Sequence, residues 1–121
     1  MSPLQLADAL TSHFPGLRRE LHAPAVLASL AAQLECFAAF TRMAAKMQDV
    51  ALLKRCFAAA EHLLQTGDAP LAAALTTSYC YRLHLDALPD GGQLARQLMP
   101  HSLYSAYAEQ QYARLHPQQG V

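Results

Sequence analysis

Residues Ala69–Tyr81 read APLAAALTTSYCY and carry no charged side chain. A surface helix normally shows a charged stripe, so a helix without one for about three turns is expected to be covered by neighbouring elements on most sides. Gly67 is suited to end the preceding helix in the left-handed conformation, Asp68 to cap the next helix, and Pro70 to occupy its first turn. This stretch, extended to Leu85, is therefore predicted to be the central helix of a helical domain.

The composition of the 121-residue chain favours a single all-α domain. Its 53% hydrophobic content is enough for one core, and abundant Ala and Leu with few Val and no Ile favour helices over strands. We expect one domain over residues 1–116, built as a bundle or a short array of antiparallel helical hairpins with about five to six helices. Residues 117–121 are expected to form a flexible tail.

Charge and cysteine content favour a cytoplasmic protein that binds neither nucleic acid nor membrane. Nine basic and nine acidic residues give a formal charge of zero, so no net field attracts phosphate backbones or anionic lipid. Three widely spaced cysteines make no disulfide framework and suit a reducing compartment. The N-terminal sequence shows no secretory signal pattern, and Gln33 and Glu35 interrupt the most apolar window, Ala23–Phe40.

Apolar residues at intervals of three and four predict further helices on both sides of the uncharged stretch. They run from Pro3 to His13, from Pro24 to about Met47, from Val50 to about Thr66, from Gln93 to Met99 and from Leu103 to about His116, with a short turn at 17–21. The second and third helices form one kinked rod in the alternative interpretation, because neither Gly nor Pro separates them, but Asp49 as a cap favours a break. A turn signal from Pro89 to Gly92 ends the central helix near Leu88, and Ser102 is expected to cap the last helix.

Cys80 and His84 are the candidate metal ligands, because they stand four residues apart on the central helix. The sequence offers no second compact ligand pair, so we expect a packed thiol and a hydrogen-bonded histidine, and predict no metal and no cofactor. Glu61 and His62 fall on the polar face of the third helix and are interpreted as a solvated pair rather than a general acid and base. A small metal-binding or enzymatic bundle that uses these four residues is the alternative function.

Nucleophilic catalysis is also disfavoured. Cys36, Cys56 and Cys80 fall in apolar helical contexts, whereas a reactive thiol needs a partly exposed, electropositive setting. No Lys-Ser or Lys-Thr pair follows the adjacent glycines, so a phosphate-binding loop is not indicated. We therefore predict no catalytic residue.

The five tyrosines lie in the central helix and near the C-terminus. Tyrosine combines a large apolar body with a polar tip, which suits protein interfaces. Tyr79 and Tyr107 are expected to pack in the core with bonded hydroxyls, whereas Tyr104 and Tyr112 are expected to be exposed. The predicted partner-binding residues on the last helix are His101, Tyr104, Gln111 and Tyr112.

Three features follow one another along the chain: Phe14-Pro15-Gly16-Leu17, Ala59–Tyr81 (AAEHLLQTGDAPLAAALTTSYCY) and Leu98-Met99-Pro100-His101-Ser102-Leu103-Tyr104. This order resembles a group of small all-helical bacterial proteins of unknown function. In that group a helix ends in Gly-Asp, an uncharged helix follows, and a Leu-x-Pro-x-x-Leu element precedes the last helix. Such proteins are often encoded near toxin systems, so the resemblance implies an immunity or adaptor role without a catalytic residue to carry over.

The expected function is that of a noncatalytic, cytoplasmic protein-interaction module, with neutralisation of a cognate bacterial toxin as its most concrete form. The balanced charge argues against an inhibitor that mimics nucleic acid. A third possibility is a self-associating structural module, in which the apolar face of the second helix forms a homodimer.

Overall fold

The computed structural model describes residues 1–115, and within them the chain is helical with no strand. The elements are α1 (Pro3–His13), the 3-10 turn η1 (Pro15–Leu17), α2 (Arg18–Leu21), α3 (Pro24–Leu27), α4 (Leu30–Lys46), α5 (Val50–Thr66), α6 (Ala69–Ala74), the π-helical segment η2 (Leu75–Cys80), α7 (Tyr81–Leu83), the 3-10 turn η3 (Leu85–Ala87), α8 (Gly92–Leu98) and α9 (His101–Leu115). The predicted all-α class is confirmed, although the elements are more numerous than the five to six helices expected. His116 and the predicted tail, 117–121, lie outside the described residues.

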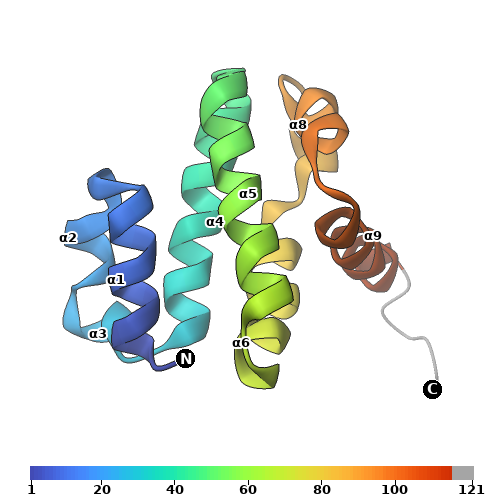
Figure 1. Ribbon diagram of the computed structural model, residues 1–121. Coiled ribbons are helices and arrows are strands. Elements are labelled where there is room, and N and C mark those ends of the chain that lie inside the picture. The colour runs from blue at the N-terminus through green and yellow to red at the C-terminus, as the bar shows by residue number, and fades with distance from the viewer. Residues whose placement is uncertain (116–121) are drawn as a thin grey trace.

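The helices are arranged around α4 and α5, which form an antiparallel hairpin in the middle of the domain (Figure 1). Figure 1 shows α1, α2 and α3 on one side of this hairpin and α8 and α9 on the other. The run from α6 through η2 to α7 packs against α4 and against α9. The most central element is α4 rather than the uncharged run predicted for that place, because α4 contacts each of α1, α2, α3, α5, α6, η2, α7 and α8.

Of the three residues predicted to mark the start of the uncharged run, Asp68 and Pro70 behave as predicted and Gly67 does not. The carboxylate of Asp68 accepts the backbone N–H of Leu71 at 3.0 Å, and Pro70 lies in the first turn of α6. Gly67 is extended, with φ −72° and ψ 160°, so the expected left-handed conformation is wrong. Glycine is required there for a different reason, because a Cβ atom would lie 2.6 Å from the carbonyl oxygen of Leu63.

The uncharged run is open to solvent on one side, which corrects the expected enclosure. Leu71, Leu75 and Tyr79 are fully buried, whereas Ala73 and Thr77 are exposed. The Thr77 hydroxyl donates to the carbonyl of Ala73 at 2.9 Å, so this polar group is satisfied within its own helix. This side of the helix therefore presents to solvent an uncharged surface of small side chains and of a hydroxyl that is hydrogen-bonded to the helix backbone.

The helix that contains the uncharged run ends at Leu83, earlier than the predicted end near Leu88. His84 adopts the left-handed conformation with φ 35° and ψ 55°, which stops the helix without a glycine. The guanidinium of Arg42 on α4 donates to the carbonyls of Leu83 at 2.6 Å and His84 at 3.0 Å. A side chain from another helix therefore satisfies carbonyls that a helix end leaves unpaired.

The predicted second helix, Pro24–Met47, is interrupted. Ser29 has an extended backbone and caps α4 through its side chain, which separates α3 from α4. The predicted break between α4 and α5 is confirmed, because Gln48 has a φ of 53° and the Asp49 side chain caps α5. The single kinked rod is therefore excluded.

Two tyrosines tie the core together, as predicted. Tyr79 is fully buried, its ring stacks on Phe37 with 4.8 Å between centroids, and its hydroxyl lies 2.9 Å from that of Thr41. Tyr107 is also buried, and its hydroxyl accepts the backbone N–H of Leu85 at 2.9 Å. Both hydroxyls are bonded, which is what burial of a polar group requires.

The apolar face of the predicted second helix is used inside the domain. Leu34, Phe37 and Ala44 on α4 are fully buried by the protein's own helices. A homodimer formed through this face would have to expose them first, so the self-associating module loses its expected interface. Among the described helices, none combines the length and the apolar character needed to span a bilayer.

Candidate functional site

The outer side of α9 carries a row of exposed residues that we call the α9 stripe. Its members are His101, Tyr104, Ala108, Tyr112 and Leu115. They are spaced 3, 4, 4 and 3 residues apart, so they share one side of the helix. Tyr104 is 43% exposed, Tyr112 58% and Leu115 74%. Three of the four residues predicted to bind a partner therefore lie in one row.

Gln111, the fourth predicted binding residue, is buried with 8% exposure. It follows Leu103 and Tyr107 at intervals of four, which places it on the side of α9 that packs against the domain. Its Nε2 atom has no hydrogen-bond partner within the described residues. The prediction that Gln111 lines the partner surface is therefore wrong, because residue type alone did not show which face of the helix is inward.

Contacts from other helices fix the position of α9. The Glu61 carboxylate on α5 accepts the backbone N–H of Leu103 at 2.8 Å, in the first turn of α9. The guanidinium of Arg114 lies 3.9 Å from the centroid of the Tyr81 ring and also donates to the Tyr81 carbonyl. Glu61 is therefore a cap rather than a solvated residue, whereas the predicted cap, Ser102, lies within α9. The stripe is presented on a helix held at both ends.

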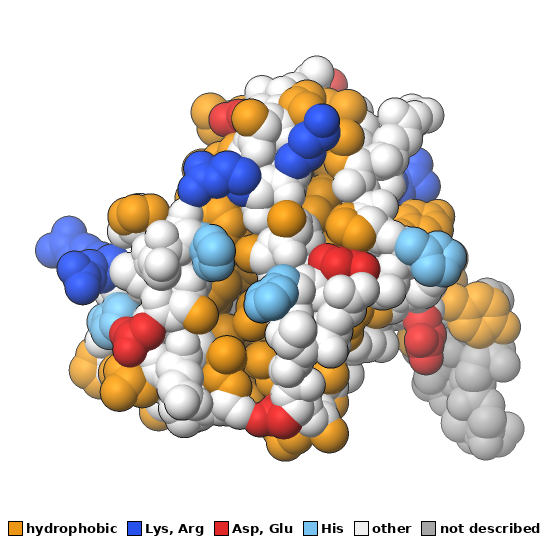
Figure 2. All heavy atoms as spheres, viewed as in Figure 1, with side chains coloured by type: hydrophobic (Ala, Val, Ile, Leu, Met, Phe, Trp, Pro, Cys, Tyr) orange, Lys and Arg blue, Asp and Glu red, His pale blue; other side chains and the backbone are white. Residues whose placement is uncertain are grey.

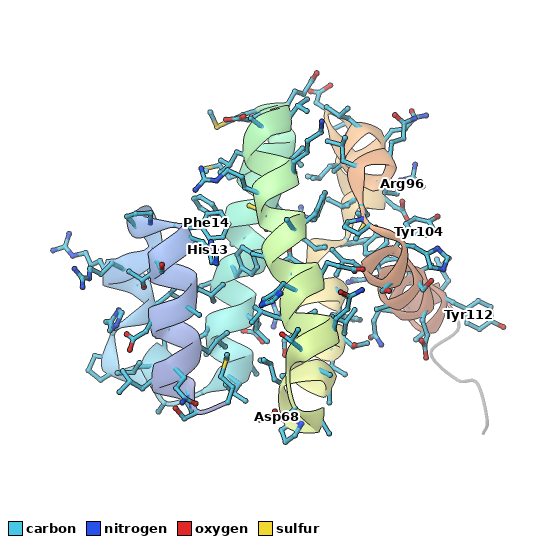
Figure 3. The ribbon with its side chains drawn as sticks, viewed as in Figure 1. His13, Phe14, Asp68, Arg96, Tyr104 and Tyr112 are labelled. Atoms are coloured by element: carbon cyan, nitrogen blue, oxygen red, sulfur yellow. The ribbon has the colours of Figure 1, made fainter. Side chains whose placement is uncertain are left out.

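A shallow hollow of about 520 Å³ continues the stripe onto α8. Its lining residues are Gln93, Arg96, Gln97, Met99, His101 and Tyr104. Arg96 pairs with Asp86 at 3.2 Å, which holds the guanidinium at the edge of the hollow. Figure 3 labels Arg96, Tyr104 and Tyr112 along this side of the domain, with Tyr112 pointing away from α5. The aromatic stripe and the polar hollow form one continuous surface.

The candidate metal ligands, Cys80 and His84, lie in different surroundings. Cys80 is fully buried in η2, and burial raises the pKa of its thiol to about 12. His84 lies beyond the helix end, and burial together with Arg114 and Arg42 lowers its pKa. Within residues 1–115, no group of three His, Cys, Asp or Glu side chains is arranged to hold a metal ion. Cys80 and His84 therefore do not share the helix face on which the metal hypothesis depended.

The side chains of Glu61 and His62 also have different neighbours, as those of Cys80 and His84 do. Glu61 binds α9 through one carboxylate oxygen and accepts the Gln65 amide at 3.0 Å through the other, whereas His62 is exposed beside α1. The four residues of the proposed enzymatic bundle thus point to different neighbours. Burial also raises the pKa of Cys56 to about 11, so this thiol keeps its proton at neutral pH.

A second surface feature, which we call the α1/α5 groove, had no counterpart among the predicted sites. It is lined by Met1, Ala9, Leu10, His13, Phe14, Arg55, Ala58, Ala59, His62, Leu63 and Thr66. Figure 2 shows histidine side chains at both edges of an apolar strip on this face, and Figure 3 labels His13 and Phe14 at the end of α1, beside α5. The groove residues on α5 follow one another at intervals of three and four, which is a pattern within one helix. The opposite wall comes from α1, about 45 residues earlier in the chain, so no local spacing connects the two walls.

Comparison with known proteins places the chain in a family. A family model described as "Domain of unknown function (DUF7674)" matches residues 7–113. The chain belongs to the DUF7674 family. No curated protein and no solved structure matches it. The DUF7674 domain includes the α9 stripe through Tyr112 and most of the α1/α5 groove. The family description is that of an uncharacterised domain and names no immunity role.

Proposed function

We propose that this protein is a noncatalytic interaction module that binds one helix of a second protein along the α9 stripe. The observation that carries the proposal is the row of exposed aromatic and apolar side chains at helical spacing, which lies beside the buried face of the same helix. An amphipathic partner helix makes its contacts at this spacing, so the stripe is complementary in periodicity to such a partner. Large tyrosines are also the side chains that contribute most at protein interfaces.

The rigidity of α9 supports the same function. Glu61 holds its first turn and Arg114 holds its last turn against Tyr81. A helix that is already ordered loses little conformational entropy when a partner binds. Exposure of Tyr104 and Tyr112 is therefore maintained by the scaffold and does not require a rearrangement.

We further propose that the partner is a bacterial toxin and that binding neutralises it. This step rests on the resemblance of the segments around Phe14, Gly67 and Pro100 to small helical proteins encoded near toxin systems. The formal net charge of zero suits an interface dominated by apolar and aromatic contacts. The experiment is co-expression with the protein encoded by an adjacent gene, followed by measurement of growth and of complex formation.

In that experiment, the unchanged chain should restore growth and should co-purify with the neighbouring protein. A Tyr104→Ala/Tyr112→Ala variant should bind roughly thirtyfold to several hundredfold more weakly, because each interface tyrosine contributes roughly 1–2 kcal/mol. The matched control is Ser102→Ala/Glu109→Ala, which changes two residues of α9 outside the stripe. Equal binding by both double variants would contradict the stripe as the interface.

Sedimentation equilibrium of the isolated chain tests the competing self-association. A monomeric mass is the expected result. A dimer dissociated by the tyrosine variant would assign the stripe to a second copy of this chain and would overturn binding to a different protein.

A further inference from the structure

The α1/α5 groove has the dimensions of a small-molecule site. It encloses about 490 Å³, within the roughly 300–1,000 Å³ typical of ligand pockets. Its base contains the buried side chains of Leu10 and Leu63. On the α5 side the lining residues that follow Arg55 are Ala58 and Ala59, whose side chains stop at Cβ. The hollow therefore exists because α5 presents small residues where it faces α1.

Arg55 is held at one end of this groove by uncharged groups. One of its guanidinium nitrogens donates to the carbonyl of His13 at 2.6 Å, and its Cζ atom lies 5.4 Å from the centroid of the Phe14 ring. Among the ion pairs formed within residues 1–115, none involves Arg55. A guanidinium carries five N–H donors, so the contact with His13 leaves donors for an incoming group.

Among the side chains that line the groove, Arg55 is the one with a permanent charge. Arg55, His13 and His62 are among its lining residues, whereas no Asp or Glu is. The whole chain balances nine basic against nine acidic residues, so this part of the surface is a local departure from neutrality. A cationic end and apolar walls are complementary to a molecule with one anionic group and a hydrocarbon body.

We infer that the α1/α5 groove binds a small amphiphile with a single carboxylate and an unbranched hydrocarbon chain. The carboxylate accepts hydrogen bonds from Arg55, and the chain lies over Ala58 and Ala59 toward Leu63. Planar guanidinium and carboxylate groups match in geometry. A nucleotide matches less well, because the groove has one permanently charged side chain and its lining includes no glycine. A bare anion would leave the apolar walls in contact with water.

The direct test is calorimetric titration of the full chain with decanoate, below the concentration at which decanoate forms micelles. Saturable binding with one site per chain is expected. Decanol, which has the same chain length without the charge, should bind about tenfold more weakly, because a charge-assisted hydrogen bond is lost. Acetate should show no measurable binding, because it lacks the hydrocarbon chain.

Three variants locate the site. Arg55→Gln should weaken decanoate binding about tenfold and leave decanol binding unchanged. Lys54→Gln is the matched control, because it removes the same charge from the same helix at an exposed residue outside the groove, and it should bind decanoate normally. Ala58→Leu, at an exposed position, should fill the groove and abolish binding of both ligands while circular dichroism shows an unchanged helix content.

Several outcomes would overturn the inference. They are the absence of saturable decanoate binding, equal losses in Arg55→Gln and Lys54→Gln, and undiminished binding in Ala58→Leu. If Arg55→Gln fails to fold, the comparison of decanoate with decanol and the Ala58→Leu variant still decide the question. Tyr112→Ala should retain decanoate binding, so this test fails or succeeds independently of the interaction proposed for the α9 stripe.

Discussion

The hydroxyl of Tyr107 on α9 accepts the backbone N–H of Leu85 from 2.9 Å away. It also lies 3.3 Å from the backbone nitrogen of Asp86. Both amides belong to η3, directly after the left-handed residue His84, where the preceding helix no longer supplies carbonyl acceptors. One buried side chain thereby joins the last helix to the turn that ends the uncharged run.

Tyr107→Phe should therefore destabilise the protein. The substitution removes the acceptor of a buried backbone N–H while it keeps the ring, and an unsatisfied buried donor costs roughly 1–3 kcal/mol. Urea unfolding followed by circular dichroism measures the loss. The control is Tyr104→Phe, which alters a hydroxyl on an exposed side chain of the same helix and should change stability by less than about 0.5 kcal/mol. Equal effects would show that the Tyr107 hydroxyl is not a structural acceptor.

Glu61→Ala should loosen the start of α9. The carboxylate supplies the acceptor for the Leu103 amide and a negative charge near the helix N-terminus, which together stabilise by about 1 kcal/mol. Hydrogen exchange at the Leu103 amide should accelerate, and Glu61→Gln should lose less because it keeps an oxygen acceptor. Glu109→Ala, an exposed residue on α9, is the control. Unchanged exchange at Leu103 in Glu61→Ala would rule out the capping role.

Gly91→Ala should be strongly destabilising. Gly91 has a φ of 82°, and a Cβ atom at this position would lie 1.7 Å from the Ala45 carbonyl oxygen on α4. Strain and the backbone shift together should cost at least about 2 kcal/mol in urea unfolding. Gly16→Ala is the matched control, because a Cβ there has no heavy atom within 4 Å. A Gly91→Ala protein as stable as Gly16→Ala would contradict the close packing of the α8 turn on α4.

The thiols should differ in reactivity. Cys56 and Cys80 are buried, with pKa values raised by burial to about 11 and about 12, whereas Cys36 is only partly buried. Since the thiolate is the reactive form, a thiol reagent at pH 8 should modify Cys36 first. Mass spectrometry of the digested protein identifies the modified residue, and modification of all three in urea is the control. Early modification of Cys80 would show that η2 opens readily.

Stability should fall at alkaline pH. The pKa of the Cys80 thiol is raised from 9.0 to about 12 in the folded protein, so its contribution is complete below pH 9 and is lost as the pH rises toward 12. Each pH unit in this range removes about 1.4 kcal/mol, because the unfolded chain releases the proton first. Cys56 acts in the same direction between pH 9 and about 11. Urea unfolding at several pH values measures how steeply the free energy of unfolding falls with pH. This fall should be less steep for Cys80→Ala than for the unchanged protein, and an identical pH dependence would contradict burial of the thiol.

Local signals in the sequence located most helix ends. The helix α1 has the predicted bounds, with the Ser2 side chain accepting the backbone N–H of Gln5 at 3.2 Å, and Asp49 marks the start of α5 as predicted. In each case the side chain that caps the helix lies within three residues of the amide it binds, so sequence spacing is sufficient. Sequence reasoning failed where the cap comes from a distant residue, as at the start of α9, where Glu61 rather than Ser102 binds the first turn.

The stripe on α9 could be predicted only in part. Tyr104, Tyr112 and His101 are exposed as expected, because their residue types suit a surface and their spacing places them together. Gln111 also has a polar side chain and directly precedes Tyr112 in the sequence, yet its side chain faces the interior of the domain. The inward direction of α9 depends on where α5 and α7 lie, which no pattern within α9 specifies.

The sequence by itself determined the all-α class, the caps at Ser2, Asp49 and Asp68, and the apolar spacing that forms the core. Those features depend on contacts between residues a few positions apart. Only the tertiary structure decided that Arg42 would bind the carbonyls at the helix end near Leu83 and that α1 and α5 would enclose a groove beside Arg55. These features join residues about 40 positions apart, and the position of one helix against another depends on packing of the whole core.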